Sequence, residues 1–592
     1  MGVPRFYWWL INKYPQHEFV TQDMPNRTDW LYLDANCLFH PVCFDVLKLY
    51  PDETDPDRLQ LLMFKRIAAY IEFLLEEADP QKGLYVSVDG VAPLAKMHQQ
   101  RERRFRSATE AEIVKGIKKA HGKDVTERWS NIVITPGTLF MEQLLEFLAN
   151  HFKRVKEEHK IQVIFSTYHT PGEGEHKILD HIRNRNLNPE WDEETYVIYG
   201  LDADLLFLTL SSQRKNLFLM REMNQLDKKK ETKKDIFDDI DDVSTEINFV
   251  NIDVMGQLYI DQLTEIIANQ SEEFGIPFDG KMDSRALIND FIFICYFLGN
   301  DFLPHIPSID IVTGGLDQIL NMYAEIYLTN GKKHIINLVK DEESGRISRV
   351  EISSLAGQLV GKLAELESDY FKTTLPKHLN RIEKRRIFES DPLARELKEL
   401  EFMKRFRVDD PVKLGVGKDE EWKHRYYSHH FKLVRNQSQL VTGVCRSYTE
   451  GLVWVANYYF VGCPDWRWQY QFTHAPFISD LYAFLNKNSP SDITFSNRRP
   501  MAPCNQLLAV VPPVRRHVLP KTYQKLITDI ESPILDYYPE SITLDMLYKD
   551  RFWLCVPLLS VIDPYRIEAA TRDLKLTASE RGRNRVMADM II

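Results

Sequence analysis

Short apolar runs alternate with amphipathic stretches over the first 320 residues of the chain. Four runs rich in β-branched and aromatic residues predict strands at residues 30–33, 84–88, 161–165 and 196–199. Between these runs, the segments 61–77 and 138–152 carry apolar side chains at helical spacing. Alternating strands and helices are typical of a mainly parallel sheet flanked by helices, so we predict an α/β domain over residues 1–320.

The rest of the chain follows two other patterns. Residues 321–440 are dense in charge and helix-forming, which predicts a helical bridging segment with solvated faces. Residues 441–592 are rich in aromatic residues and proline, and their large apolar groups favour a loop-rich but packed region. A block that changes from basic (228–234) to acidic (235–242) interrupts the first domain, and we expect a surface insertion there.

Composition narrows the class of protein. The 75 lysines and arginines are outnumbered by 86 acidic residues, for a net charge of −11, so any contact with nucleic acid must use a local basic patch. The longest apolar runs, at 291–299 and 552–562, fall short of the roughly 20 residues that span a bilayer, and no membrane association is expected. The seven cysteines are scattered without a Cys-x-x-Cys pair, which favours reduced thiols. We expect an intracellular protein, in the cytoplasm or alternatively in the nucleus.

Acidic residues follow the predicted strands at or just beyond their C-terminal ends. In an open parallel sheet those ends share one edge, where ligands bind. One further acid follows the apolar segment 291–299, at a predicted turn before two prolines. The seven acids are Asp34, Asp89, Glu173, Glu175, Asp202, Asp204 and Asp301.

Seven carboxylates at one edge would repel each other strongly unless a counter-charge is present. Oxygen ligands of this kind suit Mg²⁺ or Mn²⁺ far better than zinc. Any single acid is explained as well by a strand-end cap or a loop position, but that explanation is poor for the whole set. Two divalent ions roughly 3.5–4 Å apart support in-line displacement at phosphorus, so we predict a two-ion site.

A basic segment without helix breakers begins directly after Asp89. If residues 94–106 form a helix, one face carries Lys96, Gln100, Arg103 and Arg104. Three cations and an amide beside an acidic site form a plausible phosphate pocket. From the residues alone, a solvated basic face is an equally good explanation.

Three rings are candidates for stacking on unpaired bases. His40 lies six residues after Asp34, while Trp466 and Trp468 lie in the C-terminal region. Exposed rings beside a phosphate-cutting site can stack on single-stranded nucleic acid. The alternative for each ring is a place in the hydrophobic core.

At these positions the sequence resembles the 5′→3′ exoribonuclease family, the enzymes of RNA degradation and mRNA decay. The similarity spans nearly the whole chain and includes MGVPRFYWWL, LYLDANCLFH, VDGVAPLAKMHQQRERRFR, HTPGEGEHKI, YGLDADLLFL and FICYFLGNDFLPHIPSIDI. It continues through YYFVGCPDWRWQYQFTHAPFISDL, QLLAVVPP and SPILDYYP. The long C-terminal extension of the large cytoplasmic members is not in the sequence, so we expect a compact catalytic core.

The resemblance implies a nuclease core like that of flap endonucleases and PIN domains. It also implies roles: the seven acids match the family's metal-binding residues, and Lys96, Gln100, Arg103 and Arg104 match its pocket for a 5′-terminal monophosphate. His40 matches a base-stacking residue, and Trp466 or Trp468 is a similar candidate. The implied activity is Mg²⁺-dependent, processive hydrolysis of single-stranded 5′-monophosphorylated RNA to nucleoside 5′-monophosphates by a monomer.

Small departures from the family pattern leave this expectation in place. Cys37 stands where glycine is usual, Leu94 where arginine is common, and His98 where asparagine is common. None of them removes an acid or a pocket residue. Two other functions remain open: a structure-specific endonuclease acting on branched DNA, and an RNA-binding scaffold that has lost catalysis. The intact set of acids argues against the scaffold.

Overall fold

The computed structural model describes residues 5–24, 27–123, 125, 127, 129–202, 204–222, 245–434 and 438–592. The charge block expected to form a surface insertion, residues 228–242, lies outside the described residues. Within the described chain, no helix is both long and apolar enough to cross a bilayer.

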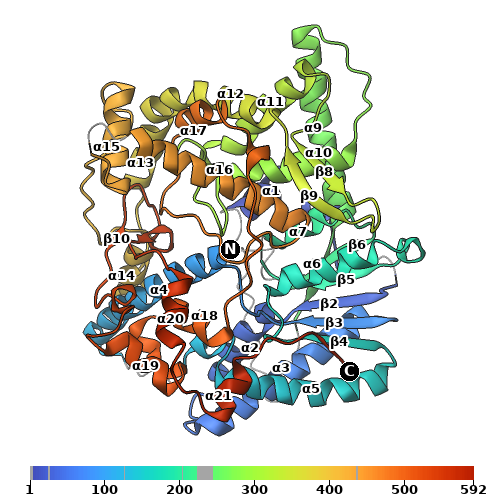
Figure 1. Ribbon diagram of the computed structural model, residues 1–592, viewed down its shortest axis with the longest axis vertical. Helices are drawn as coiled ribbons and strands as arrows, with labels where there is room; N and C mark the ends of the chain where they lie inside the picture. The colour runs from blue at the N-terminus through green and yellow to red at the C-terminus, as the bar shows by residue number, and fades with distance from the viewer. Residues whose placement is uncertain are drawn as a thin grey trace.

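A central sheet organises the N-terminal half of the protein (Figure 1). Its strands among the described residues run in the order β1-β7-β6-β5-β2-β3-β4-β12. Neighbours from β6 to β4 pair in parallel, whereas β1, β7 and β12 pair antiparallel to theirs. The strands are β1 (Val20–Thr21), β2 (Trp30–Asp34), β3 (Gly83–Ser87), β4 (Gln162–Ser166), β5 (Tyr196–Tyr199), β6 (Leu217–Glu222), β7 (Ile247–Asn251) and β12 (Met590–Ile591).

The predicted fold class is confirmed. The four strands expected at 30–33, 84–88, 161–165 and 196–199 correspond to β2, β3, β4 and β5, and they are parallel to one another. The sequence pattern did not identify β1, β6, β7 or β12. The last of these, only two residues long, adds the C-terminal end of the chain to the sheet beside β4.

Side chains alternate between two cores because successive strand residues point to opposite faces of a sheet. Leu31 and Leu33 of β2 join one buried cluster, while Trp30 and Tyr32 join the other. The first cluster is covered by α2 (Ala35–Leu49), α3 (Pro56–Ala78) and α5 (Leu139–His159). The second is covered by α1 (Phe6–Lys13), α6 (Gly174–Arg185), α7 (Asp204–Ser211), α9 (Ile252–Phe274) and α10 (Ser284–Cys295). The sheet is therefore buried on both faces, and the ends of its strands are left for the site.

Helix ends follow the capping chemistry of the sequence. The Asp55 carboxylate accepts a hydrogen bond from the Asp57 amide at the start of α3, and Thr138 caps α5 through the Met141 amide. Both predicted helices are present and extend further than their apolar spacing indicated, to Ala78 and His159. The basic segment forms one long helix, α4 (Leu94–Ala120), which continues well past residue 106.

The C-terminal half consists mainly of helices. Those within residues 315–369 and 438–485 pack against the second core, whereas the helices within residues 375–431 and 503–571 contribute to separate apolar clusters. Its elements are α11 (Gly315–Thr329), β8 (Ile336–Lys340), β9 (Ile347–Ile352), α12 (Leu355–Asp369), α13 (Leu375–Glu383), α14 (Pro392–Glu401), α15 (Asp419–Phe431), α16 (Ser438–Phe460), α17 (Ile478–Leu485), α18 (Pro503–Val510), α19 (Lys521–Thr528), β10 (Leu544–Asp545), β11 (Val556–Pro557), α20 (Pro564–Thr571) and α21 (Ala578–Arg583). The boundaries expected at residues 320 and 440 fall within α11 and α16. Helix α16 contacts the N-terminal half directly, since the Tyr459 carbonyl accepts hydrogen bonds from Arg183 and Ser211.

Candidate active site

The acids that follow the parallel strands meet at one edge of the sheet. Asp34 is the last residue of β2, Asp89 follows β3, and Asp202 follows β5. Glu173 directly precedes α6 and Glu175 lies in its first turn. These five side chains line one cavity of about 260 Å³.

The remaining two acids join the same cluster. Asp204 is the first residue of α7 and is buried. Asp301 follows a short 3₁₀ turn (Tyr296–Leu298) at the end of α10, where Gly299 reverses the chain with a φ of 84°. The ammonium of Lys96 forms ion pairs with both Glu173 and Asp301, at 2.7 Å for Asp301. The structure thus brings all seven predicted acids together.

Lys96 supplies positive charge inside the acid cluster. Burial alone would lower the pKa of Lys96, but the charges of Asp301 and Glu173 hold it well above its ordinary value. Burial likewise opposes ionisation of Asp301, yet Lys96 keeps the pKa of that carboxyl well below its usual range. This pair is therefore fully ionised at neutral pH.

Three of the other acids, Asp34, Glu175 and Asp204, lie in surroundings that oppose their ionisation. Burial, together with the charge of Asp89, raises the pKa of Asp34 to about 8. Burial raises the pKa of Asp204 to about 7 and that of Glu175 well above its ordinary value. One carboxylate oxygen each of Asp34 and Asp204 is buried without a hydrogen bond to any described residue. Such oxygens are strong acceptors without a donor, which is the environment that a bound cation satisfies.

Several residues that the sequence did not single out position the acids. The Gly174 amide donates to Asp89 Oδ1 at 2.7 Å, and the Asp89 amide donates to Asn36 Oδ1 at 3.0 Å. A Cβ atom on Gly174 would lie 2.7 Å from Asp34 Oδ1, so only glycine fits between these acids. The Cys37 thiol donates to Asp34 Oδ2 at 2.9 Å. The clues available were the glycine between two glutamates and the asparagine two residues after Asp34.

Tyr458 of α16 contacts the acid cluster from a distant part of the sequence. Its hydroxyl donates to Glu173 Oε1 at 2.9 Å, and its ring stacks on His176 with centroids 3.7 Å apart. No sequence pattern links it to the acids, because 285 residues separate it from Glu173. The C-terminal half therefore helps to hold an acid that the N-terminal half supplies.

The basic face of α4 opens into the same cavity. Lys96, Gln100 and Arg103 line it beside the acids, and Arg103 is exposed. Arg104 is placed differently: its guanidinium is largely buried and donates to Thr135 Oγ1 at 2.9 Å. Burial and the charge of Arg103 lower the pKa of Arg104 to about 9. Three of the four predicted pocket residues thus face the cavity, and Arg104 lies behind them.

The three candidate stacking rings have different surroundings. His40 lines the cavity, and burial together with Arg103 and Arg104 lowers its pKa to about 4, so the ring is neutral. Trp466 is only partly buried and lies at the start of α4, since its carbonyl accepts from the Leu94 amide at 2.9 Å. Trp468 is buried and stacks on Trp454 with ring centroids 5.4 Å apart.

The chain is similar to known proteins over its whole length. Residues 1–223 match the family described as "XRN 5'-3' exonuclease N-terminus", and residues 281–388 and 373–592 match "Xrn1 helical domain". The "5'-3' exoribonuclease 2" of Arabidopsis thaliana is 30% identical over 725 aligned positions, covering 100% of this chain and 69% of the relative. The "5'-3' exoribonuclease 1" of Saccharomyces cerevisiae is 28% identical over 100% of this chain and 44% of its own length. The human "5'-3' exoribonuclease 1" is 30% identical over 99% of this chain and 35% of the relative.

Proposed function

The chain belongs to the XRN 5′-3′ exonuclease family and is a 5′→3′ exoribonuclease, and from this premise we propose that it degrades single-stranded, 5′-monophosphorylated RNA processively to nucleoside 5′-monophosphates. One observation carries the proposal: Lys96, Gln100 and Arg103 of a single helix line the same cavity as five clustered acids. A cationic wall beside an acidic cluster can hold a phosphate next to the bond that is cut.

Nucleases of this family depend on metal ions, and the acid cluster fits a divalent cation. Its ligand atoms are carboxylate oxygens, two of them buried without a donor, which suits Mg²⁺ or Mn²⁺. When bound, two such ions supply an activated water and stabilise the leaving 3′ oxygen. The residues proposed to hold them are Asp34, Asp89, Glu173, Glu175, Asp202, Asp204 and Asp301.

The basic face selects and positions the 5′ end. Arg103 and Gln100 donate hydrogen bonds to the terminal phosphate, which carries more charge than an internal phosphodiester. Lys96 has three donors, so its ammonium can contact the phosphate while it stays paired with Glu173 and Asp301. Arg104 adds positive potential from behind and supports the helix through Thr135. Fixing the terminal phosphate places the first phosphodiester over the acids.

Two rings are proposed to hold the first bases. The neutral ring of His40 lies in the cavity wall, where it can stack on a base without repelling the cations of α4. Trp466 lies beside the start of α4 and is partly exposed, so it is the better of the two tryptophan candidates. The ring of Trp468 packs in the hydrophobic core instead, against Trp454. Because one chain supplies every residue of the cavity, we propose that a monomer is active.

Digestion of end-labelled RNA tests this function. Single-stranded RNA with a 5′-monophosphate and a 3′ label is incubated with the protein and Mg²⁺, and the products are resolved by length. The proposal predicts mononucleotides accompanied by undigested RNA, with few intermediates, and no reaction by an Asp204→Asn variant. A ladder of long fragments would instead indicate endonucleolytic cleavage, and the same assay on branched DNA would then identify the structure-specific alternative. No cleavage at all would favour a scaffold.

A further inference from the structure

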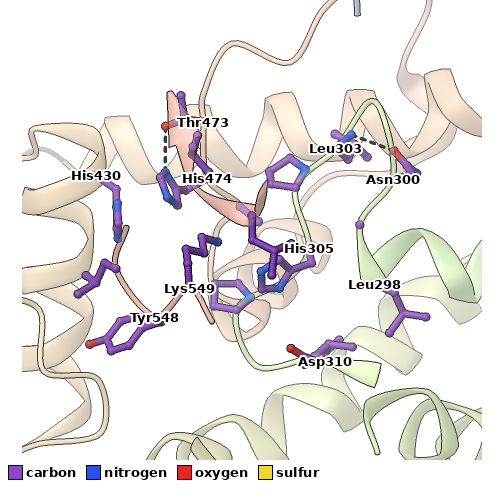
Figure 2. A pocket seen from close by; sticks show the side chains of 18 of the residues that line it. Leu298, Asn300, Leu303, His305, Asp310, His430, Thr473, His474, Tyr548 and Lys549 are labelled. Carbon is purple, nitrogen blue, oxygen red and sulfur yellow. Dashed lines mark hydrogen bonds between the residues drawn. The ribbon is translucent and has the colours of Figure 1, made fainter. Parts of the chain in front are cut away.

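A second pocket (Figure 2) lies beside the acid cluster, and Asp301 belongs to the lining of this pocket as well as to the cluster. Its volume is about 330 Å³, within the roughly 300–1,000 Å³ that small-molecule sites occupy. Its polar lining comes from distant segments: His305 follows α10, His430 lies on α15, His474 follows α16, and Lys549 follows β10. Leu303, Tyr470 and Phe472 are among its apolar walls.

Two cations, Arg5 and Lys549, line this pocket, and Arg5 is paired with Asp550. Figure 2 shows the side chain of Lys549 reaching between His305 and His474. It is partly buried, burial lowers its pKa, and its ammonium makes no ion pair or hydrogen bond with any residue in the described chain. A buried ammonium without a partner is costly, and an anionic ligand would relieve that cost.

The acids near Lys549 are already engaged by other groups. One oxygen of Asp545 accepts from both His430 Nδ1 and His474 Nε2, each at 3.0 Å. Asp550 accepts two hydrogen bonds from Arg5, at 2.8 and 3.0 Å, and Asp310 accepts one from the Val312 amide at 2.7 Å. The Lys549 ammonium therefore keeps unused hydrogen-bonding capacity.

The histidines are hydrogen-bonded to their neighbours. His430 and His474 each donate to Asp545, and His474 Nδ1 accepts from the Thr473 hydroxyl at 2.9 Å. His305 Nδ1 lies 3.1 Å from the Ile306 carbonyl, to which it donates. Burial lowers the pKa of His305, so its ring is neutral and Nε2 remains an acceptor. The pocket therefore matches a ligand with an anionic group, hydroxyl or amino donors, and an apolar ring.

We propose that this pocket binds a nucleoside 5′-monophosphate. The phosphate contacts Lys549, the ribose hydroxyls or base amino groups donate to His305, and the base packs against Tyr470 and Phe472. This ligand is the product class of the proposed reaction, so its identity rests on the proposed function, whereas the lining of the pocket does not. A divalent cation at His429, His430 and Asp545, whose ligand atoms lie within 4.8 Å of one another, fits less well. The imidazole of His430 already uses Nδ1 as a donor to Asp545, and the Lys549 ammonium would repel a cation.

The pocket lies close to the acid cluster because one turn contributes residues to both. The turn at 299–305 carries Asp301 to Lys96 and His305 to the pocket wall. Asn300 Oδ1 accepts from the Phe302 and Leu303 amides, both at 2.9 Å, which fixes the turn. A product bound here would thus lie next to the acid cluster without occupying it.

Calorimetric titration in the absence of RNA and metal tests the site. The full-length chain with Arg103→Ala, which weakens phosphate binding in the catalytic cavity, is titrated with adenosine 5′-monophosphate, adenosine and inorganic phosphate. We expect one equivalent of the nucleotide to bind, with adenosine and phosphate each about tenfold weaker or more. Adding Lys549→Met should weaken nucleotide binding about tenfold or more, while Lys525→Met, an exposed lysine of α19, should not. Equal binding with and without Lys549→Met, phosphate binding as tight as the nucleotide, or no saturable binding would each overturn the proposal.

Two further measurements distinguish a lost ligand contact from misfolding of the Lys549→Met variant. Lys549→Arg keeps the charge and should keep binding. The unsubstituted protein, photolysed with 8-azidoadenosine 5′-monophosphate, should be labelled in the peptides that contain 303–305 or 470–475. Labels confined to peptides around His40 and Arg103 would overturn the proposal. None of these readouts involves hydrolysis, so failure of the proposed function would be seen separately in the RNA digestion.

Discussion

The ammonium of Lys96 lies 2.7 Å from a carboxylate oxygen of Asp301, so the first residue of the basic face is also part of the acid cluster. The same ammonium pairs with Glu173. Lys96 therefore connects the face proposed to grip phosphate with the acids proposed to hold metal. This connection would explain why hydrolysis begins at a phosphorylated end, as proposed, because a terminal phosphate bound by α4 would lie beside the acids.

Asp204→Asn should abolish hydrolysis and leave RNA binding largely intact. The carboxylate is proposed to hold metal, and in the described chain it forms no hydrogen bond or ion pair with the basic face. Metal catalysis is worth several kcal/mol, so turnover should fall at least about a hundredfold. Turnover is measured with Mg²⁺ on 5′-monophosphorylated RNA, and binding by fluorescence anisotropy in a chelator.

Glu265→Gln is a matched control for this change, because Glu265 is an exposed acid on α9. It should retain wild-type turnover. The Asn variant should also be at least as stable as the wild type without metal, since it removes a buried charge among like charges. Substantial residual turnover in Asp204→Asn would remove Asp204 from the metal site.

Without metal, the protein should become less stable as pH rises from about 6.5 to about 8, above the range in which buried histidines with lowered pKa values, such as His40, make it more stable with rising pH. The pKa of Asp34 is raised from an ordinary 3.8 to about 8, so the folded state keeps a proton that the unfolded state has already lost. The folded state then binds more protons than the unfolded state across this window, and raising the pH favours unfolding. The melting temperature in a chelator, measured between about pH 6.5 and pH 8, should fall with rising pH.

Two comparisons separate this effect from general pH sensitivity. Asp34→Asn should flatten the dependence, and Mg²⁺ should raise stability most at the alkaline end, where the ligands ionise most readily. Asp301 has the opposite effect, because its lowered pKa makes the protein more stable as pH rises. That effect occurs at pH values near and below the ordinary carboxyl pKa, which lie outside this window. A melting temperature in chelator that rises towards pH 8 would contradict the electrostatic account of the cluster.

The two tryptophans should respond differently to truncation. Trp466→Ala should weaken RNA binding by about 1–3 kcal/mol, the worth of one stacked base, and leave the fold intact. Trp468→Ala should cost about 3–5 kcal/mol of folding stability, because its ring packs in the core on Trp454. Thermal melts and binding to a short single-stranded RNA distinguish the two effects. A Trp466→Ala protein with unchanged RNA affinity would leave His40 as the remaining stacking candidate.

The acid cluster was predictable because one simple rule applies to it. Parallel strands place their C-terminal ends on one edge, so acids after β2, β3 and β5 had to be neighbours once the strands were recognised. The short strands β1 and β12 could not be recognised, since two residues carry no periodicity and each depends on a partner strand from a distant part of the chain.

Contacts made by the tertiary structure were beyond the reach of sequence patterns. Helical spacing placed Arg103 and Arg104 on one face, yet adjacent residues diverge by about 100° around the helix, and Arg104 turns to Thr135. The burial of Trp468 depends on Gly451, where a Cβ atom would lie 3.0 Å from its ring. Spacing alone cannot report a neighbour of this kind.

The central claim is that the basic face of α4 recognises a terminal phosphate. Arg103→Ala removes a charge-assisted contact worth about 1.5–3 kcal/mol, so efficiency on 5′-monophosphorylated RNA should fall about ten- to a hundredfold. On 5′-hydroxyl RNA the contact is already missing, and the loss should be much smaller. Arg346→Ala, an exposed arginine beside β9, is the matched control and should change neither rate.

The most direct test is therefore the ratio of kcat/KM on 5′-monophosphorylated RNA to kcat/KM on 5′-hydroxyl RNA of the same sequence, measured for the wild type and for Arg103→Ala. Recognition of the terminal phosphate predicts a large ratio in the wild type that shrinks about ten- to a hundredfold in the variant. Equal slowing on both substrates, with the ratio unchanged, would show that Arg103 acts as a general backbone contact and would contradict 5′-end recognition by α4.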